Sequence, residues 1–86
     1  MWEIVFTKDA AKDKQKLDGR PQLLKKVHYL LEVIKNDPFS HPCEKLIGDL
    51  KGCYSRRINI QHRLVYKVHK DVKMVQVLSM WDHYEK

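Results

Sequence analysis

The segment Tyr54–Tyr66, YSRRINIQHRLVY, carries arginines within a pattern that is typical of a β-hairpin. Side chains alternate along a strand, so Arg57 is expected to point away from Ile58, and Arg63 away from Leu64. A planar guanidinium binds phosphate oxygens through two parallel hydrogen bonds, which suits it better than lysine to this task. The segment therefore predicts a phosphate-binding sheet face. The alternative is that these arginines pair with Asp or Glu on a solvated surface.

Two more positions carry groups that suit acid–base chemistry. Glu44 lies in a loop, and its carboxylate would serve as a general base for a sugar hydroxyl if the fold brings it to the arginine-bearing sheet. His83 has the side chain best suited to proton donation near neutral pH, and the adjacent Tyr84 offers a face for base stacking. Taken singly, Glu44 is one of several loop acids, and His83 fits a frayed terminal residue.

Other ligand and nucleophile patterns are weak. Cys43 and Cys53 are interpreted as buried or half-buried thiols and not as a disulfide framework. No CxxC or HExxH spacing accompanies His41 and Cys43, so neither a metal nor another cofactor is expected. The remaining histidines are interpreted as surface residues: His28, His41, His62 and His69.

The length and charge of the chain limit what it can be. Its 86 residues predict a single domain, 1–86, with one core. Lys and Arg number 17 against 11 Asp and Glu, a net charge of +6 that favours nucleic acid, an acidic protein or an anionic membrane surface as a partner. The start, MWEIVFTKD, predicts a strand and not a signal peptide, and no apolar run is long enough for a membrane span. A reducing cytoplasm is therefore the expected location.

The elements that must position these residues are two helices and four strands. Strands are predicted at Trp2–Phe6, Tyr54–Ile60, Arg63–Val68 and Val72–Trp81. The first helix follows an N-cap at Thr7, and the second has an apolar stripe from Leu23 to Ile34 and ends before Pro38. Pro38–Gly52 is predicted to be a long loop.

The order β-α-α-β-β-β predicts an α+β fold of two layers. Both helices pack on one face of a mostly antiparallel sheet, and the other face stays half free for a polar site. The register of the hairpin cannot be predicted, because a slip of one residue exchanges the faces. Whether Arg57 and Arg63 share a face is therefore open.

An ordered set of motifs resembles the YoeB/Txe family of toxins, a RelE-like group in type II toxin–antitoxin systems. The set comprises Glu44-Lys45-Leu46, Leu50-Lys51-Gly52, Tyr54-Ser55-Arg56-Arg57-Ile58, His62-Arg63-Leu64-Val65-Tyr66 and His83-Tyr84. The resemblance is densest from Pro38 to Tyr84, and the β-α-α order before it agrees.

The resemblance implies a ribosome-dependent endoribonuclease that cuts mRNA in the ribosomal A site without a cofactor. It assigns Glu44 as general base, Arg63 as phosphate-binding residue with Arg57 in support, His83 as general acid and Tyr84 as the adjacent aromatic residue. It also implies an antitoxin with an acidic neutralising segment, and a homodimer or a toxin–antitoxin hetero-oligomer. Two alternatives use the same basic sheet without catalysis: an RNA-binding module and a protein-interaction domain.

Overall fold

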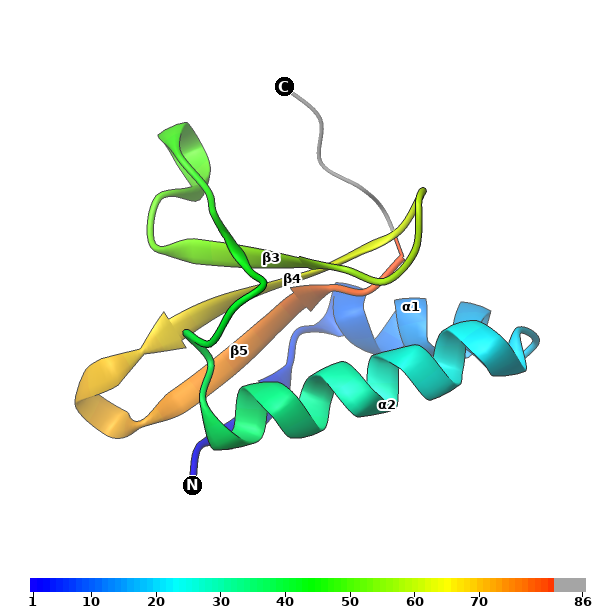
Figure 1. Ribbon diagram of the computed structural model, residues 1–86, viewed down its shortest axis with the longest axis horizontal. Helices are drawn as coiled ribbons and strands as arrows, with labels where there is room; N and C mark the ends of the chain where they lie inside the picture. The colour runs from blue at the N-terminus through cyan, green and yellow to red at the C-terminus, as the bar shows by residue number, and fades with distance from the viewer. Residues whose placement is uncertain (82–86) are drawn as a thin grey trace.

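The computed structural model describes residues 1–81 and packs two helices on one side of a five-stranded sheet (Figure 1). The helices are α1 (Lys8–Leu17) and α2 (Pro21–Asn36). The strands are β1 (Glu3–Phe6), β2 (Glu44–Lys45), β3 (Cys53–Arg57), β4 (Arg63–His69) and β5 (Met74–Ser79). The predicted α+β class and the two-layer arrangement are confirmed.

Local chemistry explains where the helices begin and end. The Thr7 hydroxyl accepts a hydrogen bond from the backbone N–H of Ala10 at 3.1 Å, so Thr7 is the predicted N-cap of α1. Pro21 occupies the first turn of α2, where its missing N–H costs no hydrogen bond. The helix ends at Asn36 because Asp37, which precedes Pro38, takes an extended conformation.

The strand order is β1-β5-β4-β3-β2, with β1 parallel to β5 and the other pairs antiparallel. The two helices form the connection from β1 to the remainder of the sheet. The sheet is therefore mostly antiparallel, as predicted. Its last strand in the chain, β5, lies between β1 and β4, which brings the two ends of the described sequence into neighbouring strands.

The structure departs most from the predicted elements in three segments. The strand from Tyr54 ends at Arg57 and not at Ile60, because the Asn59 side chain accepts hydrogen bonds from the backbone N–H groups of Gln61 and His62, at 2.8 and 2.7 Å, and forms a turn. The last strand begins at Met74, after a 3₁₀ turn over Lys70–Val72. The predicted loop contains β2 and a second 3₁₀ turn over Gly48–Leu50.

The two faces of the sheet differ in how they are covered. The helices and the helix-facing side of the sheet enclose the main core, which includes Leu17, Val27, Ile34, Leu64, Tyr66 and Val77. On the other face a small cluster forms beneath the segment from β2 to the 3₁₀ turn: Leu46, Cys53 and Val65, with Leu50 and Leu78 against it. The rest of that face stays open for polar groups. Among residues 1–81, no helix is long and apolar enough to cross a membrane.

Candidate functional site

The register of β3 and β4 answers the question that the sequence left open. Arg57 and Arg63 are direct partners across the hairpin, and partners in an antiparallel pair project from the same face. Leu64 and Tyr66 lie in the helix-covered core, so the two arginines occupy the opposite face. Arg57 is exposed, and the Arg63 side chain retains 22% of its accessible surface.

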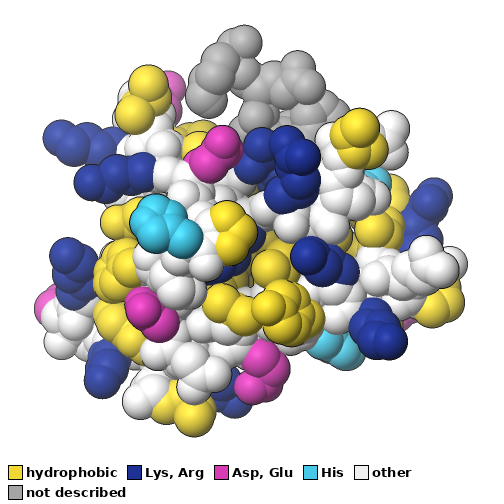
Figure 2. All heavy atoms as spheres, viewed as in Figure 1, with side chains coloured by type: hydrophobic (Ala, Val, Ile, Leu, Met, Phe, Trp, Pro, Cys, Tyr) yellow, Lys and Arg dark blue, Asp and Glu magenta, His cyan; other side chains and the backbone are white. Residues whose placement is uncertain are grey.

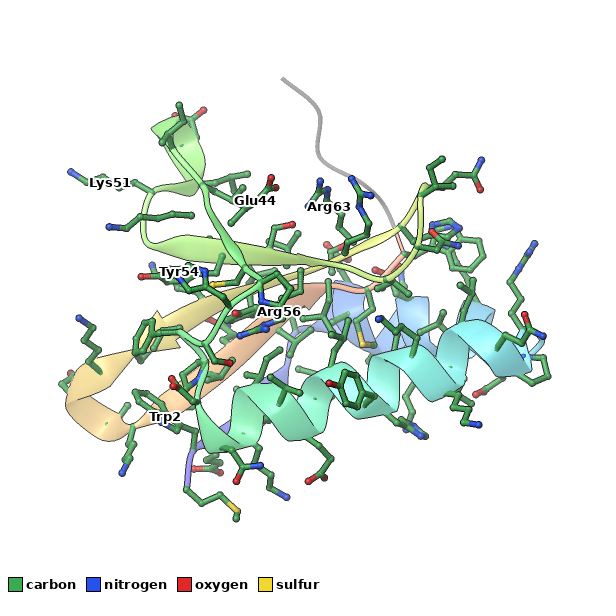
Figure 3. The ribbon with its side chains drawn as sticks, in the orientation of Figure 1. Trp2, Glu44, Lys51, Tyr54, Arg56 and Arg63 are labelled. Carbon is green, nitrogen blue, oxygen red and sulfur yellow. The ribbon has the colours of Figure 1, made fainter. Side chains whose placement is uncertain are left out.

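The short strand β2 brings Glu44 to these arginines. Glu44 pairs with Ser55 of β3, and its Oε1 lies 2.9 Å from Nη1 of Arg63. The same Nη1 donates a hydrogen bond to Ser55 Oγ at 3.1 Å. Figure 3 shows the Glu44 and Arg63 side chains pointing toward each other from the two sides of β3. The acid and the arginine thus meet although 18 positions (63 − 44 − 1) separate them in the chain.

This ion pair lies partly in water. The Glu44 side chain is 66% exposed, so solvent screens its attraction to Arg63. Within the part of the chain that the structure describes, hydrogen bonds and ion pairs of Arg63 use only Nη1. The expected surface pairing of arginine with an acid therefore exists for Arg63, and it leaves other donors of the guanidinium for a ligand.

A cleft of about 650 Å³ extends from this ion pair to α2. β2 pairs only with Tyr54 and Ser55, and the cleft lies where β3 continues beyond it. The basic and acidic groups of the sheet form one side, and α2 contributes Lys26, Tyr29, Leu30 and Val33 on the other. This volume is in the range of small-molecule sites and suits a short extended ligand.

Two residues beside the site, Arg56 and Ser55, were not among the predicted site residues. Arg56 lies on the helix-covered face and is 2% exposed, so it cannot belong to the open arginine pair. Ser55 lies on the same face as Arg57, two positions earlier in β3, and this spacing was the available signal. Its role is to accept a hydrogen bond from Arg63.

The end of the described chain lies beside the β3–β4 turn. The rings of His62 and Trp81 have centroids 4.4 Å apart, and His62 Nδ1 contacts the Trp81 backbone oxygen. His28 and His41 are exposed, as predicted, whereas His62 and His69 are half-buried and only partly at the surface. His83 and Tyr84 lie outside the described residues.

The two cysteines bear on whether the site could use a thiol or a metal ion. Cys43 is half-buried and Cys53 is buried, both as free thiols, and burial raises the pKa of Cys53. Residues 1–81 contain no group of three or more His, Cys, Asp and Glu side chains that could hold a metal ion.

Lys and Arg side chains are spread over the face drawn in Figure 2 and not gathered in one patch. The charged side chains that line the cleft are Lys26, Arg57, Arg63 and the buried Arg56, with Glu44 opposing them.

Comparisons with known proteins agree with this architecture. Residues 6–84 match the family model of the YoeB-like toxin of bacterial type II toxin–antitoxin systems. A toxin YoeB of Synechocystis is 37% identical over 67 residues, which cover 76% of each chain. A YoeB/ParE toxin structure from Agrobacterium tumefaciens superposes with a TM-score of 0.89 at 29% identity, covering 95% of this chain and 99% of that one.

A second solved structure is a YoeB–YefM complex from Staphylococcus aureus. Its matching chain is 34% identical, has a TM-score of 0.82, and is covered to 99% by an alignment that spans 98% of this chain. The family match covers most of the sequence, and it includes the hairpin and the strand that carry Glu44, Arg57 and Arg63. The chain belongs to the YoeB-like toxins of bacterial type II toxin–antitoxin systems.

Proposed function

We propose that this toxin is a ribosome-dependent endoribonuclease that cleaves mRNA in the ribosomal A site. The observation that carries the proposal is the contact of 2.9 Å between Glu44 and Arg63, with Arg57 directly across the hairpin. A carboxylate beside two guanidinium groups, at the edge of an open cleft, combines a proton acceptor with phosphate-binding charge. RNA cleavage without a metal needs both.

The proposed reaction uses the RNA's own 2′-OH as the nucleophile. Glu44 takes the 2′-OH proton, O2′ attacks the phosphorus, and the bond to the 5′-oxygen of the next nucleotide breaks. Arg63, supported by Arg57, stabilises the negative charge that grows on the phosphate oxygens. His83 donates a proton to the departing 5′-oxygen, and the ring of the adjacent Tyr84 stacks on an RNA base. The products are a 2′,3′-cyclic phosphate and a 5′-hydroxyl, so DNA is not a substrate.

The position of Trp81 supports the assignment of His83. Trp81 packs on His62, which directly precedes Arg63 in the chain. A residue two positions beyond Trp81 is at most about 7 Å further along an extended chain. The described part of the chain therefore ends at the same end of the sheet as Arg57 and Arg63.

An antitoxin is the proposed partner of the free toxin. The Staphylococcus aureus relative has been solved as a complex with YefM. A net charge of +6 favours a partner with an acidic neutralising segment, and the basic surface also suits ribosomal RNA. The proposal includes a homodimer or a toxin–antitoxin hetero-oligomer, and it places the protein in the cytoplasm, where ribosomes and mRNA meet.

The exposure of the Glu44–Arg63 pair favours one alternative. A solvated ion pair is also what a non-catalytic RNA-binding module would have on its basic sheet. Such a module would tolerate the loss of Glu44 and His83 but would lose affinity without Arg63. A protein-interaction domain would, in addition, show no preference for RNA over an acidic peptide.

The test compares Glu44→Gln and His83→Gln with wild type and with Glu32→Gln, an exposed acid of α2 that does not line the cleft. Cleavage of mRNA on programmed ribosomes is followed by mapping 5′ ends. Positioned acid–base groups contribute about 10²- to 10⁴-fold, so the first two variants should lose about this much and Glu32→Gln should lose nothing. Cleavage of an mRNA with a single 2′-deoxynucleotide at the cut position, or near-normal activity of both variants, would contradict the mechanism.

A further inference from the structure

Arg56 is a buried cation in the described part of the chain, and no carboxylate there lies within ion-pair distance of it. Burying an unpaired charge is costly unless hydrogen bonds satisfy its donors. Here the acceptors are neutral. The guanidinium Nε donates to the hydroxyl of Tyr66 at 3.0 Å, and the phenol ring belongs to the main core.

The remaining donors of Arg56 all reach one segment, Pro38–Pro42. Nη2 donates to the Ser40 backbone oxygen at 2.7 Å, to Ser40 Oγ at 3.3 Å and to the Pro38 oxygen at 3.4 Å. Nη1 donates to the Pro42 oxygen at 3.2 Å, and the Tyr66 hydroxyl donates to the Pro38 oxygen at 2.7 Å. Arg56 and Tyr66 therefore hold three carbonyls of this irregular segment by hydrogen bonds at the helix-covered face of the sheet.

This segment leads directly to Glu44. Beyond Pro42, one residue separates the fastened backbone from the carboxylate that pairs with Arg63. On its other side, Glu44 is continued by the two-residue strand β2, and the next residue, Leu46, donates its N–H to the Cys53 carbonyl at 3.0 Å. Figure 3 shows Arg56 beneath this part of the chain, on the side of the sheet opposite the Glu44–Arg63 contact.

Resting on the function proposed above, we propose that Arg56 is a positioning residue for Glu44. With Tyr66, it fixes the backbone before β2 and so keeps the Glu44 carboxylate beside Arg63. In this position the carboxylate can accept the proton of a bound 2′-OH. Only a guanidinium supplies enough donors in a fixed plane to reach the carbonyls of Pro38, Ser40 and Pro42 together with a phenol oxygen. Lysine keeps the charge but cannot span these acceptors.

The experiment compares Arg56→Lys and Tyr66→Phe with Val75→Ala, a core variant of β5 that touches neither the cleft nor the segment. Each is also combined with Glu44→Gln. The readouts are kcat and KM for cleavage on programmed ribosomes, and hydrogen exchange of the Leu46 amide. Tyr66→Phe keeps the size of a core side chain, so it remains informative if Arg56→Lys does not fold.

The expected result is a loss in kcat of about 10- to 100-fold for Arg56→Lys, with KM little changed, because a misplacement of about 1 Å costs on this order. Leu46 exchange should accelerate. Added to Glu44→Gln, the Arg56 and Tyr66 changes should cost little more, since they act through the same carboxylate. Val75→Ala should leave Leu46 exchange near wild type and combine additively with Glu44→Gln.

Three results would contradict either the positioning role of Arg56 or the proposed function, and they distinguish between the two. Unchanged Leu46 exchange and unchanged kcat in Arg56→Lys overturn the positioning role. Additive losses with Glu44→Gln also overturn it, because Arg56 would then act elsewhere. If Glu44→Gln cleaves like wild type, the proposed function fails, and Leu46 exchange alone then decides whether Arg56 holds the segment.

Discussion

The two faces of the sheet use the same chemical group for different purposes. On the helix-covered face, Arg56 is 2% exposed and bonded to neutral oxygens from the segment before β2. On the open face, Arg63 is 22% exposed, with one nitrogen shared between Glu44 and Ser55. A buried guanidinium whose three nitrogens all donate hydrogen bonds within the protein stabilises the fold, whereas one with partly solvated donors can exchange its partner for a phosphate. Burial and partners, and not residue type, separate the two roles.

The largest expected effect is on folding, and it should distinguish Arg56 from its neighbour. Arg56→Ala removes the donor to the Ser40 and Pro42 carbonyls and to the Tyr66 hydroxyl and opens a cavity, so the free energy of unfolding should fall by about 3–5 kcal/mol. Arg57→Ala, on the exposed side of the same strand, should change it by less than about 0.5 kcal/mol. Urea denaturation measures both. Equal losses would mean that burial does not divide the two arginines.

Under the proposed ribonuclease function, the next effect is expected on catalysis, at Arg63. Arg63→Ala should lower cleavage on programmed ribosomes by about 10²- to 10³-fold, the usual cost of removing one group that stabilises charge in the transition state. Arg63→Lys should fall between Ala and wild type, because it retains the charge and loses the planar fork. Equal rates for Lys and wild type would show that charge alone suffices. The free energy of unfolding should change little in either variant, since the pair is partly solvated.

A smaller expected effect is the dependence of the free energy of unfolding on pH through Tyr66, on the helix-covered face. Burial raises the pKa of Tyr66 from 10.0 to about 12, against the opposing influence of Arg56. A pKa raised in the folded state means a contribution to stability that is complete below pH 10 and is lost as the pH rises toward 12. Tyr66→Phe should cost about 1 kcal/mol at neutral pH, where it removes the hydrogen bond to Pro38, and should weaken this alkaline loss.

The measurement for Tyr66 is the free energy of unfolding across the alkaline range, in wild type and Tyr66→Phe. The difference between the two proteins isolates Tyr66 from the lysines and the other tyrosines, which titrate in both. A difference that does not change with pH would contradict the raised pKa. Because the same hydroxyl also accepts from Arg56, the result tests the buried network independently of any ribonuclease activity.

Periodicity was enough to predict the layers of this fold. The apolar stripe of α2, the Thr7 cap and the stop before Pro38 are local signals, and all three are present in the structure. The ends of β3 and β5 were not predicted, because they depend on a side-chain turn at Asn59 and on a 3₁₀ turn before Met74. Such turns depend on single hydrogen bonds that no periodic pattern reveals.

The site was predictable in its members but not in its geometry. Arg57 and Arg63 could be chosen as candidates, yet their common face depends on the hairpin register, which the connection over residues 58–62 sets. Glu44 reaches them through β2, a strand too short to give a sequence signal. Arg56 is adjacent to Arg57 and identical in type, and what separates the two is that Arg56 is buried and Arg57 is exposed.

The smallest expected effect is the contribution of the open-face ion pair to folding. A double-mutant cycle with Glu44→Gln and Arg63→Gln should give a coupling energy of about 0.2–1 kcal/mol, because both groups keep contact with water. The matching cycle on the covered face, Arg56→Lys with Tyr66→Phe, should give a larger value, since its hydrogen bond is shielded from solvent. If the open-face coupling were the greater of the two, Glu44 and Arg63 would be a structural pair, and an RNA phosphate would have to break a strong contact before it could bind.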